Sequence, residues 1–197
     1  MKKIRVLNLY AGIGGNRKLW SSDEVEVVAV ENVPQIANIY HDFFPMDKVI
    51  VCDAHEYLLK HFAEFDFIWS SPPCLSHSRA RFWGWGSKRP VYPDMKLYEE
   101  ILFLKHYFKG KWVVENVISY YKPLIEPQIV GRHCFWANFD IFTKRFDYKD
   151  IRGLSGTSKK DKLIRNMVEP EIGLHVFNCA FKTRQEVLNN LTYLTSD

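Results

Sequence analysis

The stretch KIRVLNLYAGIGGN, residues 3–16, joins a continuous apolar run to a turn that contains three glycines. The run has the length and composition of a strand buried on both faces, as strands of parallel sheets are. Gly12, Gly14 and Gly15 allow the backbone to approach a ligand closely, and a helix that follows would point its N-terminus at the same place. The spacing is not GxGxxG, however, so the turn also suits a purely structural role.

The rest of the chain continues this alternation of strand and helix patterns. We expect strands over 3–10, 25–32, 48–54, 65–71, 111–117 and 132–142. We expect helices beginning at Arg17 and over 34–44, 55–65, 94–108, 169–181 and 184–194, with Asp94 as an N-cap. The alternation predicts an α/β fold with a doubly wound, mostly parallel sheet that is covered on both faces. A length of 197 residues suits a single domain over 1–197.

Composition excludes several other classes of protein. The four cysteines are far apart and form no CxxC pair, and the seven histidines show no spacing typical of metal ligands. No apolar run approaches the roughly 18 residues that a membrane span needs. We therefore expect a cytoplasmic protein with free thiols, no metal and no membrane segment. The formal net charge is only +4, so an anionic partner must be argued from local clusters.

Acidic residues follow the second and third expected strands. Glu31 closes the run VEVVAVEN and Asp53 closes KVIVCDA. In doubly wound sheets ligands bind at the carboxyl ends of the strands, where an acid suits a ribose diol and a later Asp suits an adenine amino group. Together with the glycine turn they favour an adenosine-containing cofactor. Either acid alone is equally suited to capping a helix.

The fourth and fifth strands lead to a cysteine and an acid. Cys74 follows Pro72 and Pro73, which fix the backbone and end the strand FDFIWSS. Glu115 and Asn116 lie in the run KWVVENV, at the same expected edge of the sheet. A thiolate there is placed for covalent catalysis, and an acid beside it for protonating or holding a substrate ring. A lone cysteine, in contrast, usually has a structural explanation.

Taken in order, these motifs resemble those of the cytosine-5 DNA methyltransferases. LNLYAGIGGN is similar to the family's DLFAGIGG, SSPPCLSHS to PPCQxFS, and ENV at 115–117 to the ENV motif. PQIVGRHCFW resembles QxRxR, with Gln128 and Arg132 matching and Val130 in place of the first arginine. IRNMVEPEIGLHV resembles GNAVPP, with Asn166 at the asparagine. With Glu31 and Asp53 at the acid positions, the matches run in the family's order through most of the chain.

The resemblance implies a Rossmann-like methyltransferase fold and a mechanism. Cys74 would attack carbon 6 of cytosine, Glu115 would bind ring nitrogen 3, and Arg132 would hold the base or orient the acid. The cofactor would be S-adenosylmethionine, and the residues implied to bind it are Tyr10, Ala11, Gly12, Gly14, Gly15, Glu31, Asn32, Asp53, Ala54, Pro72 and Asn166.

The resemblance also implies duplex DNA as the partner, with the target cytosine flipped out of the helix. Residues 76–96 would be the catalytic loop, and 140–165 a short basic loop in place of a target-recognition domain. Basic residues in these loops can neutralise phosphates. The expected nucleic-acid contacts are Ser78, Arg79, Arg81, Lys88, Arg89, Lys159 and Lys160.

The chain departs from the family at several points. Leu75 replaces the usual Gln after the nucleophile, and Asn8 replaces an acid at the start of the first motif. Only residues 133–165 separate Arg132 from Asn166, too few for a large recognition domain. We therefore expect a compact, phage-type enzyme with relaxed specificity or with a partner protein that supplies it. The alternatives are methylation of RNA, as in the tRNA-methylating branch, or of a nucleotide, and a non-catalytic nucleic-acid-binding module.

Overall fold

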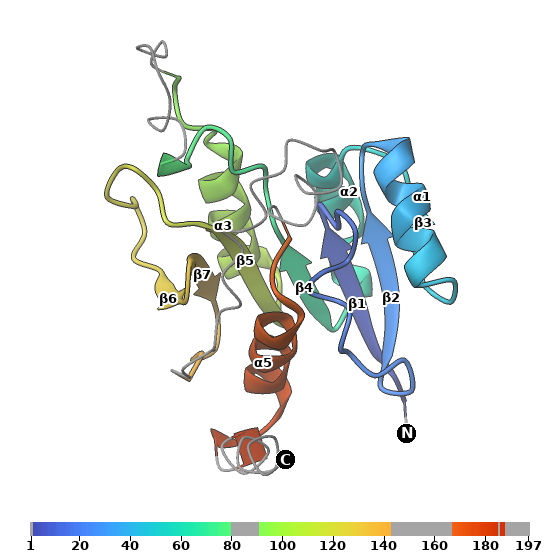
Figure 1. Cartoon of the computed structure of the whole chain (residues 1–197). Coiled ribbons are helices and arrows are strands. Elements are labelled where there is room, and N and C mark those ends of the chain that lie inside the picture. Colours follow the sequence, from blue (N-terminus) through green and yellow to red (C-terminus); the bar gives the residue numbers. More distant parts are fainter. Residues whose placement is uncertain (1, 80–90, 143–166, 185, 188–197) are drawn as a thin grey trace, which may run out of the picture.

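The computed structural model describes residues 2–79, 91–142, 167–184 and 186–187. Within them lies one seven-stranded sheet in the order β3-β2-β1-β4-β5-β7-β6 (Figure 1). The strands are β1 (Ile4–Leu9), β2 (Val25–Val30), β3 (Lys48–Ile50), β4 (Phe67–Ser70), β5 (Lys111–Val117), β6 (Gln128–Val130) and β7 (His133–Ala137). The helices are α1 (Pro34–Phe43), α2 (Ala54–His61), a short 3-10 helix (Phe62–Glu64), α3 (Lys96–Tyr107) and α5 (Pro170–Phe181).

The sheet is mostly parallel and changes direction at one side. Strands β1 to β5 pair in parallel, whereas β7 is antiparallel to both β5 and β6. The chain moves outward from β1 through β2 to β3, then returns to place β4 on the other side of β1. Ligands bind at such a switch point, outside the carboxyl ends of the strands. The doubly wound α/β fold expected from the sequence is confirmed.

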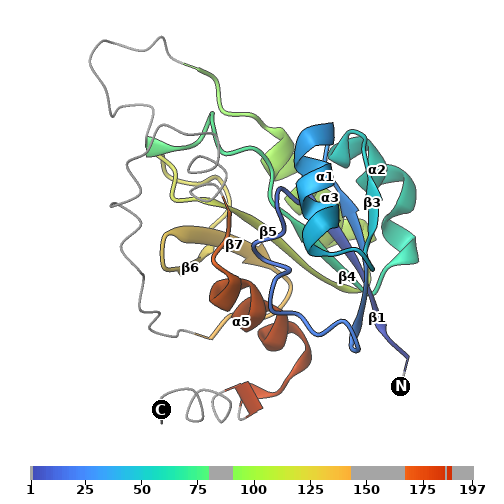
Figure 2. The ribbon, with the colours of Figure 1, turned by 45° about the vertical axis from the view of Figure 1, so that its right-hand side comes forward.

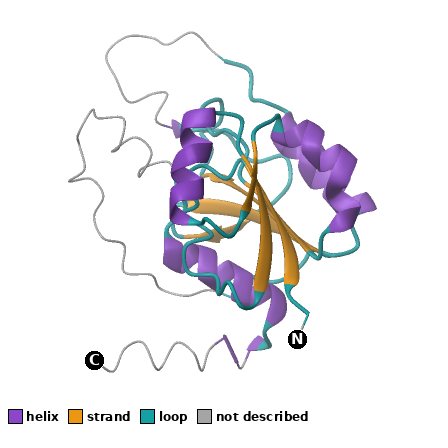
Figure 3. Cartoon of the chain, turned by 90° about the vertical axis from the view of Figure 1, so that its right-hand side faces the viewer, coloured by secondary structure: helices purple, strands orange, loops and turns teal. Residues whose placement is uncertain are grey.

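Helices cover both faces of the sheet (Figure 3). Neighbouring strand residues point to opposite faces, so Val6 joins the core under α5 while Leu7 joins the core under α2 and α3. In β4, Trp69 joins the core under α5 and Ile68 joins the core under α2 and α3. All four side chains of this strand are fully buried. This arrangement explains why the strands are continuous apolar runs.

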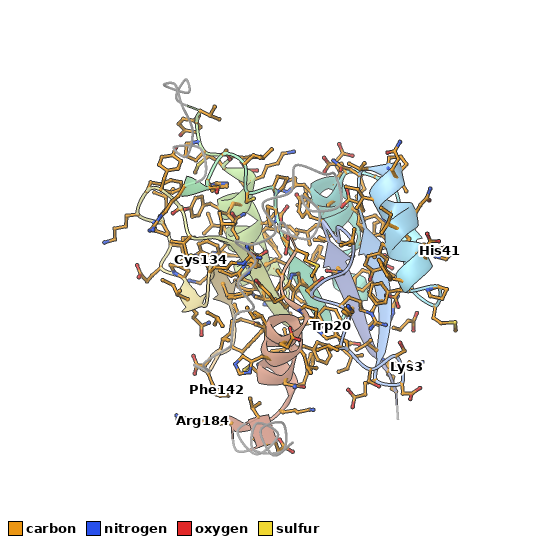
Figure 4. The ribbon with its side chains drawn as sticks, in the orientation of Figure 1. Lys3, Trp20, His41, Cys134, Phe142 and Arg184 are labelled. Carbon is orange, nitrogen blue, oxygen red and sulfur yellow. The ribbon has the colours of Figure 1, made fainter. Side chains whose placement is uncertain are left out.

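Helix α5 packs against the loop that follows β1 (Figure 2). Trp20, labelled beside α5 in Figure 4, donates from its indole Nε1 to the carbonyl of Gly173 at 3.2 Å. A Cβ added at Gly173 would lie 2.3 Å from the carbonyl oxygen of Asn16. Helix α5 therefore packs directly against the end of the glycine turn, at Asn16.

The prediction of a helix that begins at Arg17 is wrong. Residues 14–20 form consecutive turns instead, with backbone N–H groups bonded three residues back, as from Arg17 to Gly14. The Arg17 guanidinium is buried and bonds to both carboxylate oxygens of Asp47, at 2.9 and 3.1 Å, and to the carbonyl of Trp20 at 2.7 Å. These tertiary bonds outweigh the local helix propensity of the segment.

Other boundaries differ in smaller ways. Strand β3 ends at Ile50 because its partner β2 ends opposite it, at Val30. Strand β6 was not predicted, and β7 is shorter than the expected 132–142. The N-cap of α3 is Met95, although the Asp94 carboxylate accepts a bond from the amide of Lys96 at 3.1 Å. Most of the second closing helix, 184–194, lies outside the described residues, as do most of 76–96 and 140–165.

Among the helices that the structure describes, none combines the length and the apolar character needed to cross a bilayer.

Candidate active site

Most of the predicted site residues lie at the carboxyl edge of the sheet. Tyr10 directly follows β1, Glu31 directly follows β2, and Glu115 lies in the last half of β5. Strands β1 and β4 pair as far as Leu9 opposite Ser70, so the glycine turn starts beside the segment that leads to Cys74. The topology therefore brings the expected cofactor turn and the expected nucleophile to one edge.

The glycine turn has one position that faces open space. Gly12 has a φ of +56°, and a Cβ added there would meet no atom within 4 Å. Its amide donates to Glu31 Oε2 at 3.0 Å. A Cβ at Gly14 would instead lie 2.3 Å from the Phe44 ring, so that glycine permits packing against α1. Of Gly12 and Gly14, Gly12 is therefore the glycine whose backbone can approach a ligand.

The two predicted acids have different surroundings. Glu31 is buried and accepts from the amides of Gly12 and Val33, each at 3.0 Å, which leaves further lone pairs on both oxygens. Asp53 is exposed and is the N-cap of α2, accepting from the amide of Glu56 at 2.9 Å. This backbone bond lowers the pKa of Asp53. Asp53 therefore caps a helix, which was one of the two roles that its place in the sequence allowed.

A buried carboxylate that sequence reasoning missed connects these segments. Glu100, on α3, is fully buried and accepts from the hydroxyl of Tyr10 at 2.7 Å and from that of Ser70 at 2.6 Å. Its Oε1 also lies 3.1 Å from Nδ1 of His55. The signal was present, since Leu97, Glu100 and Leu104 share one face of an amphipathic helix. Glu100 holds the start of the glycine turn against the end of β4.

The nucleophile candidate, Cys74, is fixed by the two strands beside it. The Asn116 side chain donates to the carbonyl of Pro72 at 2.9 Å, and the Cys74 carbonyl accepts from the amides of His77 and Ser78. Burial raises the pKa of the Cys74 thiol, and the charge of Glu115 raises it further. The charge of Arg132 acts in the opposite direction. Both of the other predicted catalytic residues therefore act electrostatically on the thiol of Cys74.

Glu115 is paired with a histidine that sequence reasoning did not select. Its Oε1 lies 2.6 Å from Nδ1 of His133, and the other ring nitrogen, Nε2, lies 2.9 Å from Oε2 of Glu169. Glu115 and His133 are both buried. The two side chains meet because Val117, two residues after Glu115, is the cross-strand partner of His133. Without this antiparallel register, only the position of His133 beside Arg132 could have indicated its role.

Arg132 is the last residue of the hydrogen-bonded series Glu115, His133, Glu169 and Arg132. Its Nε donates to Oε1 of Glu169 at 2.8 Å, and its Nη2 donates to the carbonyl of Met167 at 3.3 Å. The family resemblance implies that Arg132 holds the base or orients Glu115. In the described residues His133 contacts Glu115 directly, and Arg132 contacts Glu169, the other acid that is bonded to His133.

The segment after Cys74 is fastened to the loop after β5. His77 is buried, with Nδ1 at 2.6 Å from the hydroxyl of Tyr121, and Ser78 forms a β-bridge with Ser119. Arg79 donates from Nε to the carbonyl of Ser119 at 3.2 Å. A groove of about 370 Å³ borders this junction, and its lining includes Arg79, Tyr120, Lys122 and Glu126. The buried position of His77 suits a structural role.

The remaining predicted residues divide by location. Ala11, Gly15, Ala54 and Pro72 are buried, and Asn32 is exposed. Arg81, Lys88, Arg89, Lys159, Lys160 and Asn166 lie outside the described residues. Within the described part of the chain, no group of three or more His, Cys, Asp or Glu side chains is placed to hold a metal ion.

Comparisons with known proteins identify the family of the chain. They define the chain as a methyltransferase that uses S-adenosylmethionine. The model of the C-5 cytosine-specific DNA methylase family matches residues 4–117, more than half of the chain, and the chain belongs to that family. Its reaction is accordingly the methylation of cytosine with S-adenosylmethionine. A search of the curated proteins gives no match.

Solved structures with similarity to the chain include three with low sequence identity. A conserved hypothetical protein of Streptococcus pyogenes is 16% identical over 70% of this chain and 86% of its own, with a TM-score of 0.46. A SAM-dependent methyltransferase of Agrobacterium tumefaciens is 16% identical over 61% and 40%, with a TM-score of 0.44. A mutant of DNMT2 from Spodoptera frugiperda is 23% identical over 58% and 36%, with a TM-score of 0.42.

Proposed function

We propose that this protein methylates carbon 5 of cytosine in DNA through a covalent adduct with Cys74. The observation that carries the proposal is the position of Glu115 beside the Cys74 segment, because Asn116, its neighbour on β5, donates to the carbonyl of Pro72 at 2.9 Å. The charges of Glu115 and Arg132 both act on the thiol of Cys74. A partly buried thiol beside an acid suits covalent attack on a ring that the acid holds.

The residues at the glycine turn fit S-adenosylmethionine. The open position at Gly12, the free lone pairs of Glu31 and the N-terminus of α2 at Asp53 provide a backbone approach and two carboxylates. Tyr10, held by Glu100, forms the entrance to the turn. We propose that these residues bind the cofactor, with Glu31 on the ribose and Asp53 on the adenine. The cofactor supplies an electrophilic methyl group on its sulfonium.

The protein residues divide the remaining chemistry. The Cys74 thiol loses its proton to solvent, and its Sγ forms a bond to carbon 6 of the ring. Glu115 donates a proton to ring nitrogen 3, which makes carbon 5 an enamine-like nucleophile. After methylation, a solvent base takes the carbon 5 proton, the bond from Sγ to carbon 6 breaks with its electron pair on sulfur, and nitrogen 3 returns its proton to Glu115, which restores the aromatic ring and the thiolate. Raising the pKa of Cys74 in the resting enzyme keeps the thiol protonated until a base is bound.

We propose that the base is flipped out of duplex DNA to reach this edge. Arg79 and Lys122 line the groove beside the Cys74 segment, where cations suit backbone phosphates. Residues 76–96 remain our proposed catalytic loop, and 140–165 our proposed recognition loop. Because the latter is short, we propose that sequence specificity is relaxed or is supplied by a partner protein.

The test is methyl transfer from labelled S-adenosylmethionine to unmodified duplex DNA, followed by base analysis. We expect label in 5-methylcytosine with the parent protein and none with Cys74→Ser. Cys52→Ser, which changes a partly exposed thiol that is not one of the proposed catalytic or cofactor-binding residues, should retain activity. Parallel reactions with RNA and with cytidine nucleotides identify the substrate. Label in RNA alone, or in neither polymer, would overturn the proposal for DNA.

A further inference from the structure

His133 lies between two carboxylates from different parts of the chain. Nδ1 is 2.6 Å from Glu115, on β5, and Nε2 is 2.9 Å from Glu169, directly before α5. The side chain of His133 is only 5% exposed. Since it contacts the carboxylate of Glu115 directly, its protonation bears on the acid that the proposed reaction needs.

The geometry fixes the number of protons in this cluster. Each of the two nitrogen-to-oxygen contacts requires one hydrogen, so Glu115, His133 and Glu169 together hold two protons. The two protons have two arrangements along these bonds. Either His133 is an imidazolium between two carboxylates, or it is neutral and one carboxyl is protonated. The arrangements differ by the shift of a single proton across one hydrogen bond.

Arg132 decides which carboxyl takes that proton. Its guanidinium lies 2.8 Å from Glu169, and a charged partner at that distance favours the ionised form of the acid. Burial alone would raise the pKa of Glu169, but His133 and Arg132 outweigh it and lower that pKa to about 2. Burial would lower the pKa of His133, yet Glu115 and Glu169 outweigh it and raise that pKa to about 9. The mobile proton therefore moves between His133 and Glu115.

We propose that His133 is a positioning residue that stores the proton of Glu115 and returns it, while Glu169 and Arg132 hold the imidazole in place. The inference deepens the proposed function and rests on it. The proton that Glu115 gives to ring nitrogen 3 comes from Nδ1 of His133, which passes it to Glu115 as the bond from nitrogen 3 to hydrogen forms. His133 keeps its Nε2 proton on Glu169 and ends neutral, and Glu115 ends as a carboxylate. When the methylated base forms, nitrogen 3 returns the proton to Glu115, which passes it back to Nδ1.

The charged and titratable groups around this pair set the expected pH dependence. Among the described residues they are Glu115 on β5, Cys74 after β4, Cys134 on β7, Arg132 before β7 and Glu169 before α5. Turnover should fall on the alkaline side as His133 loses its proton near pH 9. A Gln at position 133 keeps a hydrogen-bonding group but stores no proton. Glu115 must then take its proton from solvent, which a carboxyl does only at lower pH.

The first experiment compares pH profiles of kcat for methyl transfer by the parent and by His133→Gln. We expect kcat of the variant to fall at least about tenfold at neutral pH and its alkaline limb to move to lower pH. The KM for S-adenosylmethionine should change less than about twofold, because Glu31 and Gly12 are unaltered. Glu169→Gln keeps the histidine at position 133 but removes the carboxylate that holds its ring, so it should shift the alkaline limb of the kcat profile in the same direction. His175→Gln changes a buried histidine of α5 outside the site and should leave the profile unchanged.

The second experiment measures the titration of His133 by NMR of its ring nitrogens and needs no turnover. We expect an imidazolium that titrates near pH 9 in the parent protein and at lower pH in Glu115→Gln. A parent that methylates no cytosine substrate would defeat the proposed function while leaving this measurement intact. Titration of His133 near its ordinary pKa, or an unchanged kcat profile in His133→Gln, would overturn the proton-storing role.

Discussion

The thiol of Cys74 is tuned by its neighbours before any substrate is present. Burial and the charge of Glu115 raise its pKa, and the charge of Arg132 opposes them. Because the thiolate is the reactive form, the rate of alkylation at a fixed pH reports the pKa of the thiol. The two charged neighbours should therefore have opposite effects on alkylation when each is neutralised.

We expect Glu115→Gln to speed alkylation of Cys74 by iodoacetamide and Arg132→Gln to slow it, each by at least about twofold near neutral pH. The first change removes a negative charge and lowers the pKa of the thiol, and the second removes a positive charge and raises it. Mass spectrometry of the Cys74 peptide over time gives the rates. At high pH, where the thiol is ionised in every variant, the differences should vanish.

Cys52 provides an internal control for this measurement. Burial and Asp53 raise its pKa, and neither Glu115 nor Arg132 contributes to the shift. Its alkylation rate should be the same in the parent and in both variants. If the two substitutions changed Cys74 in the same direction, the electrostatic site described above would be wrong.

At the scale of single elements, helix α5 depends on one glycine. Gly173 is buried against the backbone of Asn16, and an added Cβ would lie 2.3 Å from its oxygen and 2.6 Å from its Cα. Alanine normally favours a helix over glycine by about 1 kcal/mol. Here the backbone that the Cβ meets is not free to move, since Trp20 also bonds to the carbonyl of Gly173. Crowding should therefore outweigh propensity.

We expect Gly173→Ala to lower the free energy of unfolding by about 1–3 kcal/mol, as overpacked cores do. Urea denaturation followed by circular dichroism measures the change. Lys105→Ala, at an exposed position of α3, should stay within about 0.5 kcal/mol of the parent. A more stable Gly173→Ala protein would show that α5 does not pack closely on the glycine turn.

The loop after β1 is held by a buried ion pair where a helix was expected. Arg17 and Asp47 have side chains only 3% and 5% exposed, and Tyr40 adds a bond to the same carboxylate at 2.8 Å. Removing one partner leaves the other charged and buried. We expect Asp47→Ala to cost about 3–5 kcal/mol of unfolding free energy, measured by chemical denaturation.

The matched control for Asp47 is an exposed pair. Lys60 and Glu56, one turn apart on α2, lie 3.5 Å apart with side chains 68% and 70% exposed. Lys60→Ala should cost less than about 0.5 kcal/mol, because water screens the charges. Equal losses in Asp47→Ala and Lys60→Ala would mean that the Arg17 pair contributes nothing beyond a surface contact.

At the scale of the whole molecule, the sequence predicts the sheet well because its strands are buried on both faces. Continuous apolar runs such as WVV at 112–114 leave little choice of structure, and β5 was predicted to the residue. The conformation of the segment at Arg17 was not predicted, because it depends on Asp47, a partner in the turn before β3. Strand β6 is short and is specified by its pairing with β7 rather than by its own pattern.

In the candidate site, too, some residues were predictable from the local sequence and others depend on distant partners. Cys74, Glu115 and Glu31 were predictable because strand ends in one fold class meet at one edge. His133 and Glu100 were not, since each contacts its partner across 18 and 90 residues of sequence, respectively. Such contacts depend on the antiparallel register of β7 and on the face that α3 buries. Motifs therefore indicate the groups that we propose to react, whereas the groups that hold them are set by packing.

Cofactor binding should stabilise the whole molecule, because the glycine turn is fastened to several elements at once. It contacts β2 through Glu31, α3 through Glu100 and α5 through Trp20. A ligand that binds only the folded protein adds about 2.7 kcal/mol at 100 times its Kd. For a chain of this size each kcal/mol raises Tm by about 2–4 °C.

We therefore expect S-adenosylmethionine at about 100 times its Kd to raise Tm by about 5–10 °C, measured by differential scanning calorimetry. Glu31→Gln should lose at least half of this rise at the same concentration, because it removes the carboxylate that bonds to Gly12 and faces the open turn. Glu26→Gln alters an exposed acid on the same strand and should retain the full rise. Each variant without cofactor serves as its own reference, so a change in basal stability does not affect the comparison. An equal rise in Glu31→Gln and Glu26→Gln would place the cofactor away from Glu31.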